Sequence, residues 1–137
     1  VISEESANKM LYMLKAVVDG GTATRLRYKY DLKGEIAGKT GTTNNNSDAW
    51  FMGITPTLVS GCWVGADDRD IHFDNMTYGQ GAAMALPIFS YYMKKVYADK
   101  QLGYHDSEVF DLDEGYNPCL YGDDNDDDMN DIEEVYE

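Results

Sequence analysis

The sequence has little cysteine, little proline and no long apolar run. Two cysteines, Cys62 and Cys119, among 137 residues are too few for a disulfide framework. Cys62 lies in an apolar run and is expected to be a buried thiol, and a bridge to Cys119 stays open. No stretch approaches the roughly 18 apolar residues of a membrane span, and no signal peptide is recognisable. The length of 137 residues predicts one domain at most, with a modest core.

Basic residues are missing from the last part of the chain. Residues 101–137 carry fourteen acids and no base, whereas residues 1–100 carry eleven of each, so the tail holds the whole net charge of −14. This distribution argues against a nucleic-acid partner, which needs a basic surface. We therefore predict a folded part over residues 1–100 and an acidic, flexible tail over residues 101–137.

The tail contains a partial match to a calcium-binding loop, the first of two motifs that the sequence only resembles in part. The tail matches the ligand positions of an EF-hand, but Asp128 replaces the obligatory glycine and flanking helices are not apparent. We predict no metal site. The matching residues are Asp123, Asn125, Asp127 and Glu134.

A phosphate-binding loop is the second motif that fails. Gly38-Lys39-Thr40 follows Gly34 with only three residues between the glycines, one fewer than a Walker A loop requires. The Thr- and Asn-rich continuation is also a poor helix start, because these residues favour strands and turns. A nucleotide cofactor is not predicted, and neither is any other cofactor.

Hydrophobic periodicity predicts five regular elements. Residues 4–18 have apolar residues at helical spacing after Ser3, a suitable N-cap, and Gly20 and Gly21 can end this helix. Short turns link three strand candidates, which makes neighbouring strands antiparallel. The fold class is therefore α+β, a three-stranded antiparallel meander flanked by helices. The strands span residues 35–43, 48–55 and 58–66, and the second helix spans residues 81–98.

Consecutive apolar residues in two of these strands predict a sheet that is covered on both faces. They are Trp50-Phe51-Met52 and Cys62-Trp63-Val64. Trp50, Phe51 and Trp63 are accordingly interpreted as core aromatics.

The segment Lys39-Thr40-Gly41-Thr42 has the pattern of an anion-binding strand. Alternation on an extended strand places Thr40 and Thr42 on one face and Lys39 on the other. Two hydroxyls can hydrogen-bond one carboxylate, Gly41 allows a close approach, and a strand edge can pair with a peptide. The pattern predicts a receptor for a peptide carboxylate. The alternative is a surface lysine on a Thr-rich strand.

The longer string "IAGKTGTTNNNSDAWFMGITPTLVSGCWVG", residues 36–65, resembles the C-terminal transpeptidase stretch of class A, bifunctional penicillin-binding proteins. Its Lys-Thr-Gly resembles the third motif of penicillin-recognising serine enzymes. The strings "GQGAAMALPIFSYYMKKV" and "VISEESANKMLYMLKAVVDGGTATRL" are similar to the closing helix and to the helix before the motif strand. The resemblance covers about residues 1–98 and implies a partial transpeptidase domain of the penicillin-binding-protein and serine β-lactamase type.

The resemblance implies roles for the motif residues. Lys39 and Thr42 would be catalytic: Lys39 supplies positive charge and helps to protonate the leaving group, and the Thr42 N–H is half of an oxyanion hole. Thr40, Gly41, Thr42 and Thr43 would bind the substrate. The substrates of the intact protein would be a peptidoglycan stem peptide and β-lactams.

The nucleophile of that family is missing at its expected place. Ser-x-x-Lys and Ser-x-Asn occur only as the overlapping Ser6-Ala7-Asn8-Lys9, and one serine cannot fill two positions. We interpret Ser6 as an ordinary first-turn residue. The chain is therefore expected to be inactive alone, as a fragment that supplies one wall of the active site.

Two functions and several attributes remain as expectations. The first function is this transpeptidase fragment, and the second is a non-catalytic module that binds a peptide or protein through the same edge. The resemblance implies an intact protein with a glycosyltransferase domain, anchored on the periplasmic side of the bacterial inner membrane. We predict no membrane contact from this segment, and self-association through its exposed edges.

Overall fold

The computed structural model describes residues 2–112. Within this range, a three-stranded antiparallel sheet lies in the sequence between helices, as predicted. Its strands are arranged in the order β1-β2-β3. The predicted α+β meander is confirmed. The helices are α1 (Glu4–Asp19), α2 (Arg25–Tyr28), α3 (Met76–Gly79), α4 (Ala85–Ala98) and the 3-10 helix η1 (Lys100–Leu102), and the strands are β1 (Ala37–Thr42), β2 (Asp48–Ile54) and β3 (Val59–Gly65).

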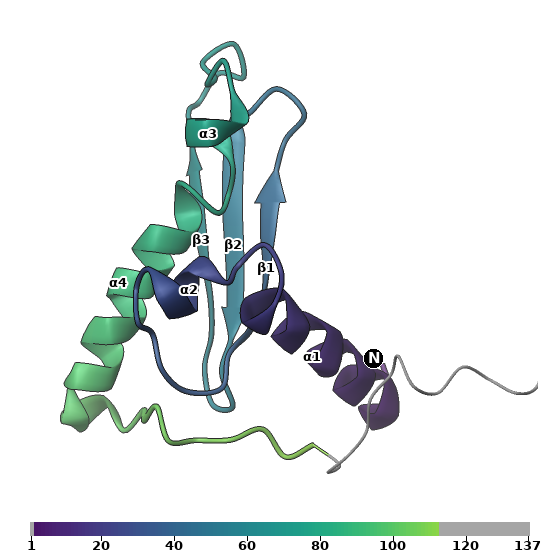
Figure 1. Cartoon of the computed structure of the whole chain (residues 1–137), viewed down its shortest axis with the longest axis vertical. Coiled ribbons are helices and arrows are strands. Elements are labelled where there is room, and N and C mark those ends of the chain that lie inside the picture. Colours follow the sequence, from purple (N-terminus) through teal and green to yellow (C-terminus); the bar gives the residue numbers. More distant parts are fainter. Residues whose placement is uncertain (1, 113–137) are drawn as a thin grey trace, which may run out of the picture.

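One face of the sheet packs against α4, which runs along it in Figure 1. Phe51 of β2 is fully buried, and its ring centroid lies 4.8 Å from that of Phe89 in α4. Gly53 makes this contact possible, because a Cβ there would lie 2.2 Å from the Phe89 ring. We call this side the α4 face. It carries most of the sheet's contribution to the core.

The opposite face of the sheet carries Trp50, Met52 and Trp63. We call it the open face. These side chains are 45%, 41% and 46% exposed. The prediction that both faces are covered is wrong for the described residues, and so is the assignment of Trp50 and Trp63 to the core. The strict alternation of a strand sends neighbouring side chains to opposite faces, and only the face beneath α4 has a covering layer here.

Helix α1 begins and ends as its sequence predicts. The Ser3 side chain accepts a hydrogen bond from the Ser6 N–H at 3.2 Å, and Gly20 is the C-cap. The apolar stripe of α1 is covered unevenly, since Val18 is buried, Leu11, Leu14 and Val17 are partly buried, and Met10 is 49% exposed.

Residues 103–112 lead from η1 back toward α1, below the sheet in Figure 1. Phe110 N–H donates to Glu35 Oε2 at 2.7 Å, and Lys15 Nζ in α1 donates to Glu35 Oε1 at 2.5 Å. Partial burial would raise the pKa of Glu35, but these hydrogen bonds outweigh it and leave that pKa below its ordinary value. Glu35 therefore joins α1 to this segment. The predicted boundary at residue 100 stays a prediction.

No helix within residues 2–112 is long and apolar enough to cross a membrane. No group of His, Cys, Asp or Glu side chains in the same range could hold a metal ion. Cys119 and the EF-hand-like residues lie outside the described residues. Cys62 is half-buried rather than fully buried, and desolvation raises the pKa of its thiol.

Candidate substrate site on the edge strand

Strand β1 is an edge strand of the described sheet and contains the Lys39–Thr42 segment in extended form. Thr40 pairs with Phe51 and Thr42 with Ala49, which places both threonines on the α4 face. Lys39 pairs with Met52 on the open face. The alternation predicted from the sequence is therefore present.

The backbone of β1 turns its alternate N–H groups outward. Thr43 N–H donates to Asp48 C=O at 3.1 Å, which makes these two residues a hydrogen-bonded pair. In an antiparallel ladder such pairs alternate with pairs that make no mutual backbone hydrogen bonds. Because Thr42 directly precedes Thr43, its N–H points away from β2. The same alternation turns the backbone groups of Thr40 outward.

Lys39 is exposed, and its ammonium group folds back onto this outer edge. Its Nζ donates to the Thr40 C=O at 2.7 Å. Because the Thr40 carbonyl is turned away from β2, this contact brings a positive charge to the edge where the Thr42 N–H also lies.

The two threonine hydroxyls each have a partner on another segment. Gly81 N–H donates to Thr42 Oγ1 at 3.0 Å. Thr40 Oγ1 lies 2.9 Å from Thr22 Oγ1, in the loop after α1. Neither Thr22 nor Gly81 was predicted from the sequence. Their positions 18 and 39 residues from their partners carry no local signal that could have identified them.

Thr43 occupies a different position from the other predicted substrate-binding residues. Its Oγ1 accepts from Asp48 N–H at 2.9 Å and lies 3.0 Å from Ser47 Oγ. These hydrogen bonds close the turn between β1 and β2. The structure therefore joins the Thr43 hydroxyl to the hairpin, one residue beyond the end of β1, while Gly41 pairs with Trp50 inside the strand.

Asp48, the first residue of β2, stabilises the same hairpin through its carboxylate. Its Oδ1 accepts from Trp63 Nε1 at 3.0 Å, and its Oδ2 accepts from Ser47 Oγ at 2.9 Å. Hydrogen bonds from Ser47 and Trp63 hold the pKa of this carboxyl below its usual value. Asp48 thus connects the hairpin to β3.

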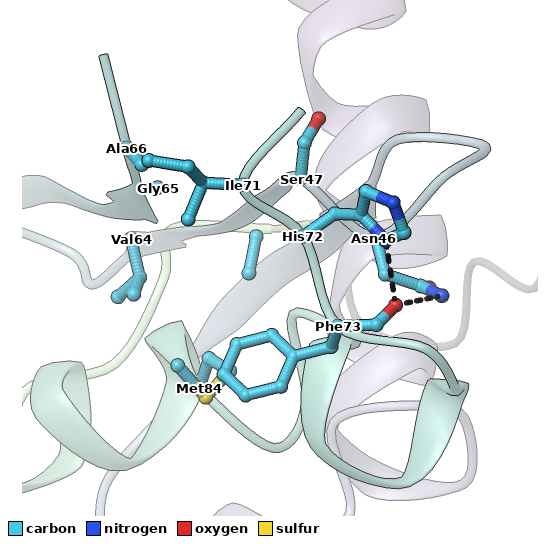
Figure 2. A pocket seen from close by; sticks show the side chains of 11 residues that line it. Asn46, Ser47, Val64, Gly65, Ala66, Ile71, His72, Phe73 and Met84 are labelled. Atoms are coloured by element: carbon cyan, nitrogen blue, oxygen red, sulfur yellow. Dashed lines mark hydrogen bonds between the residues drawn. The ribbon is translucent and has the colours of Figure 1, made fainter. Parts of the chain in front are cut away.

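A cavity of about 360 Å³ lies beside the hairpin and is shown in Figure 2. The Phe73 carbonyl at its edge accepts from Asn46 Nδ2 at 3.2 Å and lies 3.3 Å from His72 Nδ1. None of the predicted site residues lines this cavity. The lining residues are Asn46, Ser47, Ala49, Val64, Gly65, Ala66, Ile71, His72, Phe73, Gly79 and Met84.

Ser6 lies in the first turn of α1 and is exposed. Its hydroxyl accepts a hydrogen bond from Ser3 Oγ at 3.0 Å. This contact belongs to the helix N-terminus, in agreement with the interpretation of Ser6 as a first-turn residue.

The edge strand, its outward N–H groups and its lysine and threonines define a wall suited to an anionic peptide end. A family model for the penicillin binding protein transpeptidase domain matches residues 1–86. The chain therefore belongs to that family, as a fragment of a transpeptidase domain.

Individual relatives agree with this assignment. The chain is 46% identical over 84 residues to penicillin-binding protein 1A of Aquifex aeolicus, covering 61% of this chain and 11% of that protein. It is 38% identical over 101 residues to penicillin-binding protein 1B of Haemophilus influenzae, covering 73% of this chain and 12% of that protein. The resemblance to class A proteins is confirmed, and the chain spans about a tenth of the length of these relatives.

A solved structure of a penicillin-binding protein has a similar fold over most of this chain. The crystal structure of penicillin-binding protein 1A from Haemophilus influenzae matches 80% of this chain with a TM-score of 0.64 and 31% identity. The match covers 17% of that chain. The sheet and helices described above thus correspond to a small part of that longer chain.

Proposed function

We propose that this chain supplies the carboxylate- and oxyanion-binding wall of a D,D-transpeptidase that cross-links peptidoglycan. The observation that carries the proposal is the placement of Lys39, Thr40 and Thr42 along one edge strand whose Thr42 N–H is turned outward. The substrates are the D-Ala-D-Ala end of a stem peptide and β-lactams, whose carboxylate mimics it.

The Thr42 N–H is the proposed oxyanion donor. A serine outside this chain attacks the peptide carbonyl, and negative charge develops on the carbonyl oxygen. A backbone N–H aimed at that oxygen stabilises the charge without reorganisation. The outward direction of this N–H, set by the hydrogen-bond pattern of β1, supports the role.

Lys39 is the proposed source of positive charge. Its ammonium group at the Thr40 carbonyl lies on the same edge as the oxyanion donor. There it attracts the substrate carboxylate, which the Thr40 and Thr42 hydroxyls can then bind through hydrogen bonds. It would also help to protonate the departing D-alanine. Gly41 has no side chain and so allows a ligand to approach the backbone of this edge closely.

The intact protein would act in the cell envelope, on the periplasmic side of the inner membrane, with a glycosyltransferase domain and a membrane anchor. These attributes follow from the class A relatives and remain proposals for this chain. Without a serine nucleophile at the edge strand, the chain alone would be inactive.

Labelling with a fluorescent penicillin tests the proposal. The first sample is this chain alone. The second is full-length Aquifex penicillin-binding protein 1A in which residues 1–98 of this chain replace the matching segment. We expect no covalent label on the chain and a stable label on the folded graft.

Substitutions in the graft then test the individual roles. Thr42→Pro deletes the proposed oxyanion donor and should slow labelling by about 10²–10³. Lys39→Met should also slow labelling strongly. Lys29→Met is the control, since Lys29 is an exposed lysine outside β1. A graft that folds but stays unlabelled, or a Thr42→Pro variant that labels normally, would contradict the proposal.

A further inference from the structure

Gly81 lies in the loop between α3 and α4 and packs directly on the β1–β2 pair. It is buried, and its N–H donates to Thr42 Oγ1 at 3.0 Å. A Cβ at Gly81 would lie 2.4 Å from the Trp50 carbonyl oxygen and 2.5 Å from the Gly41 carbonyl oxygen. Both atoms belong to the backbone of the sheet and cannot move aside cheaply. Only glycine therefore allows this N–H to reach the threonine.

The hydrogen bond from Gly81 N–H limits how the Thr42 hydroxyl can bind a ligand. A hydroxyl has one proton to donate and two lone pairs to accept. Gly81 N–H occupies one lone pair, so the hydroxyl proton is directed elsewhere. Because Thr42 is exposed, that proton is available to a ligand at the edge. A carboxylate presents two charged acceptor oxygens to this donor, whereas a carboxamide presents one neutral acceptor oxygen and an NH₂ group that only donates, so the carboxylate forms the stronger hydrogen bond.

We propose that Gly81 is a positioning residue that fixes the Thr42 hydroxyl as a donor and thereby makes the site select carboxylate over carboxamide ligands. The inference rests on the proposed function of β1. It adds a specificity determinant outside the Lys-Thr-Gly-Thr segment, 39 residues along the chain from Thr42.

A second contact holds the same loop in place. Arg25 Nη1 in α2 donates to the carbonyl of Ala82 at 3.4 Å, directly beside Gly81. Ala82 is 7% exposed, so this part of the loop is packed into the domain. Contacts with Thr42 in the sheet and with Arg25 in α2 therefore fix the position of the Gly81 N–H.

The experiment compares two ligands in the full-length graft. One is a penicillin, and the other is the same penicillin with its carboxyl group converted to an amide. The measured quantity is the ratio of the two second-order acylation rates. We expect Gly81→Ala to lower this ratio about tenfold, since a hydrogen bond to a charged group is worth about that factor or more. A lower ratio is an effect that general destabilisation would not produce.

Gly79→Ala, at the last residue of α3 and two residues before Gly81, is the matched control. A Cβ at Gly79 would lie 2.4 Å from Asn46 Cβ, so this change is as crowded as the one at Gly81 but does not touch Thr42. We expect it to lower the thermal midpoint and to leave the ligand ratio unchanged.

Arg25→Met provides a second variant if Gly81→Ala fails to fold. It removes the weaker loop anchor and should lower the ratio about two- to threefold. An unchanged ratio in a folded Gly81→Ala variant, or in Arg25→Met when Gly81→Ala does not fold, overturns the inference. An equal fall of the ratio in Gly79→Ala overturns it as well. Absence of labelling in the folded graft itself would instead overturn the proposed function.

Discussion

Phe51 and Trp50 are neighbours on β2, yet Phe51 is fully buried and Trp50 is 45% exposed. Phe51 lies on the α4 face against Phe89, whereas Trp50 lies on the open face beside Trp63, with ring centroids 6.4 Å apart. Both faces therefore carry large aromatic side chains, but within residues 2–112 only one face lies beneath a helix. The comparison shows that an aromatic residue in a strand is buried only where another layer covers it.

The largest expected difference between the faces is in stability. Phe51→Ala should lower the free energy of unfolding by about 3–5 kcal/mol, because it leaves a cavity against Phe89. Met52→Ala, the adjacent change on the open face, should cost less than about 1.5 kcal/mol, since this side chain is 41% exposed. Urea unfolding of the chain measures both. Equal losses for the two variants would show that the open face is covered in solution.

The second expected difference is in self-association. The double variant Trp50→Ser/Trp63→Ser should weaken self-association of the chain about tenfold or more, because it removes two large half-exposed rings from the open face. Light scattering over a range of concentrations measures this. Tyr28→Ser is the control, since Tyr28 is 73% exposed on α2. A wild-type chain that stays monomeric at high concentration would refute the prediction.

The smallest expected effect concerns Asp48, which holds the Trp63 indole at the edge of the open face. Its pKa is lowered in the folded chain, so its ionised form stabilises the fold above the ordinary pKa of about 3.9. This contribution is lost as the pH falls through the lowered value. Tryptophan fluorescence should therefore change in this acidic range.

Asp48→Asn should remove that transition, whereas Asp67→Asn, at an exposed loop residue, should keep it. The same fluorescence titration of both variants checks the assignment. A transition that persists in Asp48→Asn would assign it to another carboxyl group.

Much of the fold could be predicted from local patterns. Ser3 and Gly20 bound α1 as expected, and short turns gave the meander its order. The short helices α2 and α3 were not predicted, because four-residue helices carry too little periodicity.

The candidate site could be predicted only in part. Lys39, Thr40 and Thr42 follow from strand alternation together with the longer resemblance. Thr22 and Gly81 could not be found this way, because their contacts depend on how distant loops return to β1.

The order of the elements, the alternation of β1 and the family could all be read from the amino-acid sequence, because each depends on local spacing or on one contiguous string of residues. Tertiary structure alone decided which face of the sheet α4 covers, which way the Thr42 N–H points and which groups hold the threonine hydroxyls. Those features depend on pairing register and on contacts between segments far apart in the chain, and local residue preferences do not encode them.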